Sequence, residues 1–537
     1  MSTAPPSSAN PRRTSPASAL GSHPGRILGV LAVAALLVNF IETMLVPALP
    51  KLASFFDNAP YTTVAWVLSA YLVVGVCTTP VFAKLGDLYG KRRMLAIVLG
   101  VYSLAVGLAP VTPQLGALVG LDRAQSIYLL IGVRGLQGLG LAMFPLALAM
   151  VAESLPKERV APAQGLIASM FAAGAALGLV GGSWLIQNVG WQVAYASVLP
   201  FVLILPVLAA RWLPAGHLGT GGAMDLPGAA LLGGALASLL VGLTLGPTWG
   251  WTAWAARAVG GVGFGVPDLF AIAAAFAALF IWRERVAEEP IIDLTRLRHR
   301  NISLSYFGAL LVGLGLFTAF VVLTVLVEFP VVGLGDSVLA FGLASIPTTL
   351  GMFVAAPLVG RGVARFGPRP FVLLGAGLAI TGFVLLLSFH ATYLELVLEA
   401  IPTFVGLVTV LVSVTNVIAL SAHQGETGIH MGMTEMFQDL GASAGPVMVA
   451  TFLATYTRTV AVPSASGAPD LVTVPSGSAI TLIFIAGALV AALLAVVGLL
   501  LENHRVGVAA PTVSPESGRG ASEPPRTPGL STVTGER

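Results

Sequence analysis

Charged residues are scarce in this chain of 537 residues. Asp, Glu, Lys and Arg together make up 9% of it, whereas soluble domains carry about 25%. The single cysteine, Cys77, lies in an apolar run and excludes both an internal disulfide and a cysteine-rich metal site. Because 56% of the residues are hydrophobic, water cannot be the main solvent of the folded chain.

The sequence also lacks the common catalytic motifs. It has no glycine-rich nucleotide loop ending in Lys and Ser or Thr, no His-Glu-x-x-His zinc helix and no Gly-x-Ser-x-Gly elbow. We therefore expect neither an enzyme nor an ATP-driven pump. We also expect no cofactor, no metal site and no nucleic-acid partner.

Long apolar runs recur from Ile27 to Leu501, separated by short polar breaks. Windows of about twenty residues give about fourteen membrane spans, and such spans must be helices because hydrocarbon offers no partner for free backbone groups. The sequence therefore predicts an all-α integral membrane protein. A count of twelve or thirteen stays open, because the segment from Trp249 to Val266 reads as interfacial or re-entrant.

Lysine and arginine are concentrated in alternate loops. The loops around Lys91, Lys157, Arg283 to Arg300 and Arg365 fall on one side of the predicted membrane, which the positive-inside rule assigns to the cytoplasm. An even number of spans then places both ends in the cytoplasm. Residues 1–25 and 502–537 are rich in Ser, Pro, Gly or Thr, so we expect two disordered cytoplasmic tails.

An internal repeat divides the chain. The stretch that starts at Pro80 aligns with the stretch that starts at Pro357, so that Gly90 meets Gly367, and Gly165 meets Gly432 at a similar offset. Parallel halves of this kind build alternating access around a site near the bilayer midplane. We predict six-helix bundles at 26–212 and 301–501, joined by two extra central helices within the linker 213–300.

A basic loop with a single acid joins the second and third spans. It reads Gly86-Asp87-Leu-Tyr-Gly90-Lys91-Arg92-Arg93. Gly90 can take a turn that bulkier residues cannot, and Asp87 can cap or pair near a neighbouring helix end. The loop is therefore either a plain positive-inside anchor or a latch between the two halves.

This loop resembles the signature between the second and third helices of the major facilitator superfamily, although Ala83 stands where that signature has its first glycine. Over residues 26–501 the chain is similar to the fourteen-span drug:proton antiporters of that family. The resemblance implies the major facilitator fold and a monomer. It also implies that Asp87 helps to close the cytoplasmic side.

The fourth span contains Arg134, in the run Arg134-Gly-Leu-Gln-Gly. An arginine at the centre of a span costs about 3 kcal/mol unless it has partners. It is either a structural arginine satisfied by carbonyl groups or part of a proton-coupling site. The run resembles the family's pattern in that helix.

Glycines line one face of the fifth span: Gly174, Gly178, Gly181 and Gly182. Glycines four residues apart let another helix approach closely, so by themselves they predict packing. The run resembles the antiporter signature of that helix, but Leu179 occupies the position of its proline. This departure weakens the inference of antiport.

Three acids inside the spans are candidates for carrying protons. Glu42 lies midway along the first span, where apolar surroundings favour a protonated carboxyl group. Glu435 and Asp439 lie one helical turn apart in a later span, and their repeat counterparts are Ala168 and Ala172. The alternative is a position of these two acids among the cytoplasmic lipid headgroups, where a carboxylate costs little.

Together these features predict a proton-coupled exporter of small amphipathic or drug-like molecules in the cytoplasmic membrane. The expected partners are a small-molecule substrate, protons and the lipid bilayer. An exporter or flippase of lipid-like molecules on the same fold is the alternative. A proton-coupled nutrient importer fits less well, because it would need more polar groups in the spans than this chain has.

Overall fold

The computed structural model describes most of the chain between its two tails. The described residues are 24–45, 52, 54–57, 61–214, 222–254, 257–259, 262–288, 290–292, 299–328, 333–335, 338–388, 392–421, 426–462 and 470–502. Both predicted tails therefore lie almost wholly outside the described residues.

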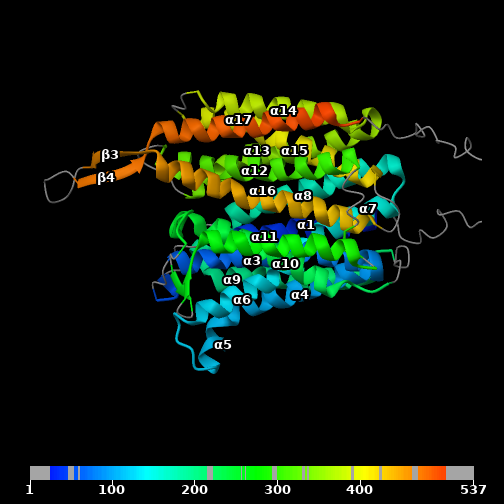
Figure 1. Ribbon diagram of the computed structural model, residues 1–537, viewed down its shortest axis with the longest axis horizontal. Helices are drawn as coiled ribbons and strands as arrows, with labels where there is room; N and C mark the ends of the chain where they lie inside the picture. Colours follow the sequence, from blue (N-terminus) through cyan, green and yellow to red (C-terminus); the bar gives the residue numbers. More distant parts are fainter. Residues whose placement is uncertain are drawn as a thin grey trace, which may run out of the picture.

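The first half of the chain forms helices that run roughly parallel or antiparallel to one another (Figure 1). Helices α4 and α5, and likewise α6 and α7, are joined through short 3₁₀ turns. The helices are α1 (Pro24–Met44), α3 (Tyr61–Tyr89), α4 (Lys91–Leu108), α5 (Thr112–Leu118), α6 (Ser126–Gly138), α7 (Met143–Ser154), α8 (Lys157–Val189) and α9 (Trp191–Trp212).

Two further helices, α10 (Leu226–Trp249) and α11 (Val266–Val286), follow this half and pack against each other. Helix α10 also packs against α3 and α16. The segment between α10 and α11, which the sequence left as interfacial or re-entrant, contains a short antiparallel hairpin of β1 (Arg257–Val259) and β2 (Val262–Phe264). The ring of Trp251 stacks on that of Phe270, with centroids 6.4 Å apart.

The second half repeats the plan of the first. A hairpin of β3 (Thr457–Val462) and β4 (Asp470–Pro475) projects from the helices at the left of Figure 1. The helices are α12 (Arg300–Glu328), α13 (Val338–Phe366), α14 (Pro368–Leu385), α15 (Tyr393–Ser421), α16 (Thr427–Thr455) and α17 (Gly477–Leu500).

Among the described residues, 13 helical segments are long and apolar enough to cross a membrane. Helix α16 is not one of them, although it has 29 residues and packs against α12 and α3 inside the bundle. Its polar side chains, Glu435 and Asp439 among them, lower its hydropathy. With α16 the total reaches the predicted fourteen, and the prediction of an all-α membrane fold is confirmed.

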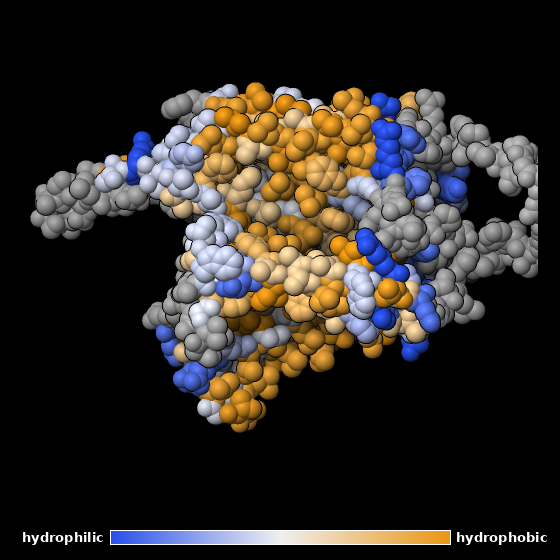
Figure 2. Space-filling view, in the orientation of Figure 1, coloured by the Kyte–Doolittle hydropathy of each residue, from blue (hydrophilic) through white to orange (hydrophobic). Residues whose placement is uncertain are grey.

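A small apolar cluster between α8, α13 and α15 and two large ones form the interior. One of the large clusters lies mainly among α1 to α9 and includes Leu99 and Leu130, and the other lies among α12 to α17 and includes Phe383 and Leu494. Ile429, at the start of α16, belongs to the first cluster. On the face that Figure 2 shows, hydrophobic residues form a broad band and hydrophilic residues gather at its two ends, as a membrane-spanning bundle requires.

Candidate cytoplasmic gate and membrane carboxylates

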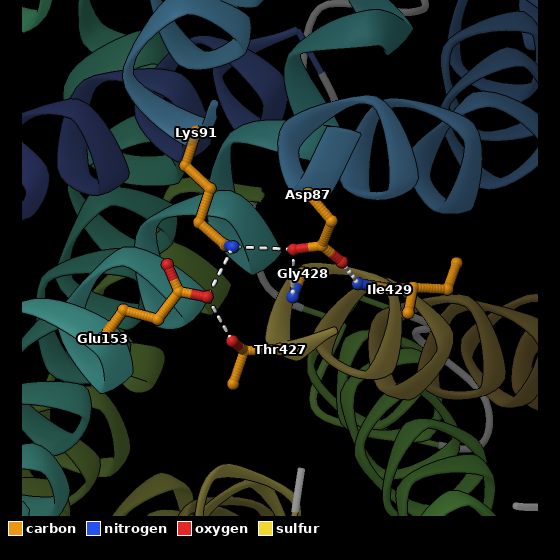
Figure 3. Close-up of polar contacts among 6 residues, drawn as sticks. All are labelled: Asp87, Lys91, Glu153, Thr427, Gly428 and Ile429. Atoms are coloured by element: carbon orange, nitrogen blue, oxygen red, sulfur yellow. Dashed lines mark hydrogen bonds and ion pairs between the residues drawn. The ribbon is translucent and has the colours of Figure 1, made fainter. Parts of the chain in front are cut away.

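Asp87 joins the two halves of the molecule at one end of the bundle. It lies at the end of α3, and its carboxylate accepts hydrogen bonds from the backbone N–H groups of Gly428 (3.0 Å) and Ile429 (2.7 Å) at the start of α16 (Figure 3). The first N–H groups of a helix have no partner within the helix and carry partial positive charge. Asp87 therefore caps a helix of the other half.

Lys91 lies beside this cap and is shared by two acids. Its ammonium group is 2.6 Å from a carboxylate oxygen of Asp87 and 2.6 Å from one of Glu153, which lies near the end of α7. Glu153 in turn accepts a hydrogen bond from the hydroxyl of Thr427 on α16 (Figure 3). Because Asp87 and Lys91 are both buried, each charge depends on these partners. We call Asp87, Lys91, Glu153, Thr427, Gly428 and Ile429 the polar latch.

Small residues allow α3 and α16 to meet so closely. A Cβ atom on Gly428 would lie 2.5 Å from Oδ1 of Asp87 and 2.7 Å from the carbonyl oxygen of Ala83. A Cβ atom on Gly432 would lie 2.5 Å from the Cβ atom of Ala83. Gly90, between α3 and α4, has a φ of 95°, which favours glycine and lets Lys91 turn back toward Asp87.

Two other residues of the predicted gate motif contact their own half among the described residues. Arg92 donates to the carbonyl oxygen of Leu213, 3.3 Å away at the end of α9, so it lies outside the polar latch with which the sequence grouped it. Gly86 packs against the side chain of Leu146 on α7. The hydrogen bonds of the polar latch that cross between the halves are those of Asp87 and Glu153, and Lys91 binds both of these acids.

Glu42 and Arg134 are linked through a tyrosine. The hydroxyl of Tyr71 on α3 donates to a carboxylate oxygen of Glu42 on α1, at 3.1 Å. The guanidinium carbon of Arg134 lies 4.7 Å from the centre of the Tyr71 ring, within the range of a cation–π contact. Arg134 is close enough to Glu42 for the two charges to attract each other.

The guanidinium of Arg134 is buried, with 1% of the residue exposed. It donates to the carbonyl oxygen of Val67 (3.0 Å) and to the side-chain oxygen of Gln137 (2.7 Å). Nη2 of Arg134 has no hydrogen-bond partner among the described residues. These contacts explain how the arginine is tolerated in a span, and they leave one donor group available.

Glu435 and Asp439 approach Glu42 from the other half. Both lie on α16, and their carboxyl groups interact electrostatically with that of Glu42 on α1. Glu435 is buried inside the bundle, with 4% of the residue exposed. Acids from both halves therefore gather around one region.

The glycines of α8 line its contact with α1. Cβ atoms on Gly174 and Gly178 would collide with the backbone of Leu36 and Phe40, and one on Gly182 would lie 2.6 Å from Cα of Met44. Gly181 has more room, since its nearest neighbour would be the Phe40 ring at 3.6 Å. These glycines bring α8 against the helix that carries Glu42.

Sequence reasoning missed Tyr71 and Glu153. Tyr71 lies in an apolar span, where nothing distinguishes it from other aromatic residues. Glu153 lies near a helix end, where acids are usually solvated. Both contribute through contacts with residues far away in the sequence.

Comparisons with known proteins agree with this architecture. The sequence profile of the Major Facilitator Superfamily matches residues 31–223. The multidrug transporter protein MdtP of Bacillus subtilis is 25% identical over 76% of this chain and 71% of its own length. The tetracenomycin C resistance and export protein of Streptomyces glaucescens is 28% identical over 82% and 78%, and the multidrug efflux pump LfrA of Mycolicibacterium smegmatis is 27% identical over 81% and 82%.

The fold has a counterpart among solved structures. The crystal structure of the human organic anion transporter MFSD10 superposes with a TM-score of 0.57 at 17% identity, covering 88% of this chain and 99% of that one. At that identity the likeness concerns the fold alone. Together with the profile match over residues 31–223, it gives the chain an all-α fold of the major facilitator type.

Proposed function

We propose that the chain is a proton-coupled exporter of small amphipathic, drug-like molecules that works by alternating access. The observation that supports the proposal is the electrostatic interaction of Glu42 on α1 with Glu435 and Asp439 on α16, which involves carboxyl groups of both halves. Carboxyl groups inside a membrane are costly unless they are paired or protonated, so they mark pathways for ions and protons.

Arg134 and Tyr71 set the charge balance around Glu42. Deprotonated Glu42 gains from the hydrogen bond of Tyr71 and from the nearby guanidinium. A proton on Glu42 removes the attraction to Arg134, and a cationic substrate close to the acids competes with that proton. Such competition couples the release of substrate to the uptake of a proton.

The polar latch supplies the second element of the cycle. Six residues from both halves close one end of the bundle, and the loop that carries Asp87 is basic, as cytoplasmic loops are. Breaking the latch would let the halves separate at the cytoplasmic end and admit substrate. In this proposal both ends of the chain are cytoplasmic, and a monomer suffices.

The names of the relatives support the substrate class. MdtP and LfrA are named as a multidrug transporter and a multidrug efflux pump, and the Streptomyces protein as a tetracenomycin C resistance and export protein. The low polarity of the spans agrees with lipophilic substrates.

The test is uptake of a lipophilic fluorescent cation into inverted vesicles that contain the purified protein, with and without an imposed pH gradient. We expect accumulation that depends on the gradient and that disappears in Glu42→Gln. Glu288→Gln removes an exposed carboxylate beyond the end of α11 and is the matched control. If Glu42→Gln accumulates the cation at the normal rate and still responds to the gradient, the coupling role assigned to Glu42 is wrong.

A folded, inserted protein that moves no cation would argue instead for export of lipid-like molecules. The same vesicles with a fluorescent lipid in one leaflet would measure that activity directly.

A further inference from the structure

A buried tyrosine of α9 lies beside Arg134 and has no part in the coupling described above. Tyr195 has 0% of its surface exposed. Its hydroxyl lies close to the side chains of Arg134 and Gln137, but it has no hydrogen-bond partner among the described residues. Because a buried hydroxyl without a partner is costly, its presence at this place needs an explanation.

Arg134 has an unused donor next to this hydroxyl. Its Nε donates to the carbonyl oxygen of Val67 and its Nη1 to the side-chain oxygen of Gln137, whereas Nη2 has no partner within the described part of the chain. A guanidinium can only donate hydrogen bonds, and a hydroxyl oxygen can accept them. The two unused groups are therefore complementary, and a small movement of the guanidinium would join them.

The ring of Tyr195 is held in place by other aromatic rings. Trp191 meets it edge-on, with ring centroids 6.4 Å apart and planes at 90°. Trp191 in turn meets Phe55 edge-on, with centroids 5.5 Å apart. The hydroxyl of Tyr195 therefore has a fixed position, to which the longer side chain of Arg134 can move.

The partners that Arg134 needs depend on the charge of Glu42. When Glu42 is deprotonated, its carboxylate attracts the guanidinium and accepts the hydrogen bond of Tyr71. When Glu42 takes up a proton, Arg134 stays charged but loses this attraction, and a buried cation then depends on its hydrogen bonds. Tyr195 offers an acceptor that does not depend on the charge of Glu42.

Other titratable groups also surround Glu42. The hydroxyl of Tyr102 donates to the carbonyl oxygen of Val38, 3.1 Å away, and so already has a partner. Helices α7 and α8, which also pack against α1, carry charged residues only close to the turn between them. Among the described residues, the titratable groups around Glu42 are Tyr71 (α3), Tyr102 (α4), Arg134 (α6), Tyr195 (α9), and Glu435 and Asp439 (α16).

We propose that Tyr195 is a positioning residue for proton exchange, which accepts a hydrogen bond from Nη2 of Arg134 when Glu42 is protonated. When Glu42 is charged, the guanidinium leaves Tyr195 and is held by the carboxylate. The inference rests on the coupling role proposed for Glu42. Because the bond to Tyr195 forms only after the proton has arrived, it favours the protonated state.

The test is infrared spectroscopy of the purified full-length protein over a range of pH, since a protonated carboxyl group gives a C=O stretching band that a carboxylate does not. The band that Glu42→Gln removes belongs to Glu42. In Tyr195→Phe, the pH midpoint of this band should fall by about one unit, because a hydrogen bond to a charged group contributes about that much. The substitution keeps the ring and its packing on Trp191, so the melting temperature should not fall.

Two further variants separate this role from a general effect on the core. Tyr102→Phe removes another buried hydroxyl, one that donates to a backbone carbonyl, and should move the midpoint by less than half as much. In an Arg134→Met background, Tyr195→Phe should cause no further shift, because its effect requires the guanidinium.

An unchanged midpoint in Tyr195→Phe would overturn the inference. An equal shift in Tyr102→Phe, or a shift of the same size with and without Arg134, would also overturn it. If no band of Glu42 titrates in the unsubstituted protein, the proposed coupling role fails and this inference fails with it. A band that titrates but does not respond to Tyr195→Phe removes this inference alone.

Discussion

The two contacts between the halves follow one plan but use different chemistry. Where α3 meets α16, a carboxylate binds two N–H groups of the opposite helix and a lysine binds two carboxylates. Where α8 meets α13, Ala364 replaces the acid, and Pro162, which corresponds to Ile429, has no N–H group to donate. Glycines bring the backbones together in both.

This difference assigns different tasks to the two contacts. A polar contact can be broken and remade, because water can replace each hydrogen bond when the helices separate. Where two helix backbones pack directly against each other, as in α8 and α13, water cannot replace the lost packing. Such a contact tolerates small rotations of the helices better than their separation. We therefore expect the polar latch to open during transport while α8 and α13 stay together as a pivot.

The largest effect is expected for Asp87→Asn. The amide keeps one acceptor oxygen but loses the charge that holds Lys91 and the α16 N–H groups, and hydrogen bonds to charged groups contribute about 1.5–3 kcal/mol. Hydrogen exchange at Gly428 and Ile429 should become at least about tenfold faster, and export should slow to a similar degree.

Exchange in the backbone of α8 around Ala161 serves as the internal control and should not change. If hydrogen exchange became equally faster at both contacts, the two contacts would open together, and the different tasks assigned to them would be wrong.

Gly360→Ala tests the pivot. The added methyl group would press on the backbone of Ala161, which cannot rotate away, and overpacking of this kind costs about 1–3 kcal/mol. We expect a lower melting temperature of the purified protein. Gly377→Ala, on α14, adds the same methyl group where no atom lies within 4 Å and is the control. A melting temperature as high as that of the control would show that the α8–α13 contact is loose.

Neighbouring basic residues of the loop should differ in effect. Lys91→Gln leaves Asp87 and Glu153 buried without their shared cation, whereas Arg92→Gln loses one hydrogen bond to Leu213 in its own half. Export rates in vesicles should fall several-fold for Lys91→Gln, because two buried carboxylates are left without a cation. For Arg92→Gln the rate should stay within about twofold, since the free energy at stake is about 1 kcal/mol at most. A larger fall in the export rate with Arg92→Gln would show that Arg92 takes part in the gate.

Local sequence patterns predicted the helices and the residues of the gate loop, but not the contacts between distant segments. Apolar runs gave the spans, and the spacing of glycine, aspartate and lysine pointed to Asp87 and Lys91. The hydrogen bond between Thr427 and Glu153 joins residues 274 positions apart, and no local pattern encodes such a pairing. Arg92 was grouped with Lys91 for the same reason, since sequence does not show which way each side chain turns.

The hairpin between α10 and α11 illustrates the reverse case. Val259 and Val262 flank a Gly-Gly pair, which is a sequence signal for a two-residue hairpin turn. The tryptophans nearby drew the interpretation toward a membrane interface.

The smallest effect is expected for an ion pair that lies within one helix pair. Arg283 on α11 binds both carboxylate oxygens of Asp225, which immediately precedes α10. Desolvation acts to raise the pKa of Asp225, but the hydrogen bonds and charge of Arg283 outweigh it and hold this pKa below its usual range. The stabilisation is therefore present above the unfolded pKa, near 4, and is lost as the pH falls through the lower folded value.

Asp225→Asn should lower the stability by about 1 kcal/mol or less at neutral pH, since Arg283 is partly solvated. It should also flatten the acid limb of the melting temperature as a function of pH. Hydrogen exchange at Gly428 and Ile429 should be unchanged, because the pair does not join the two halves. Faster hydrogen exchange at Gly428 and Ile429 would show that α10 and α11 take part in closing the polar latch. The helix pair α10–α11 would then be a third element that holds the two halves together.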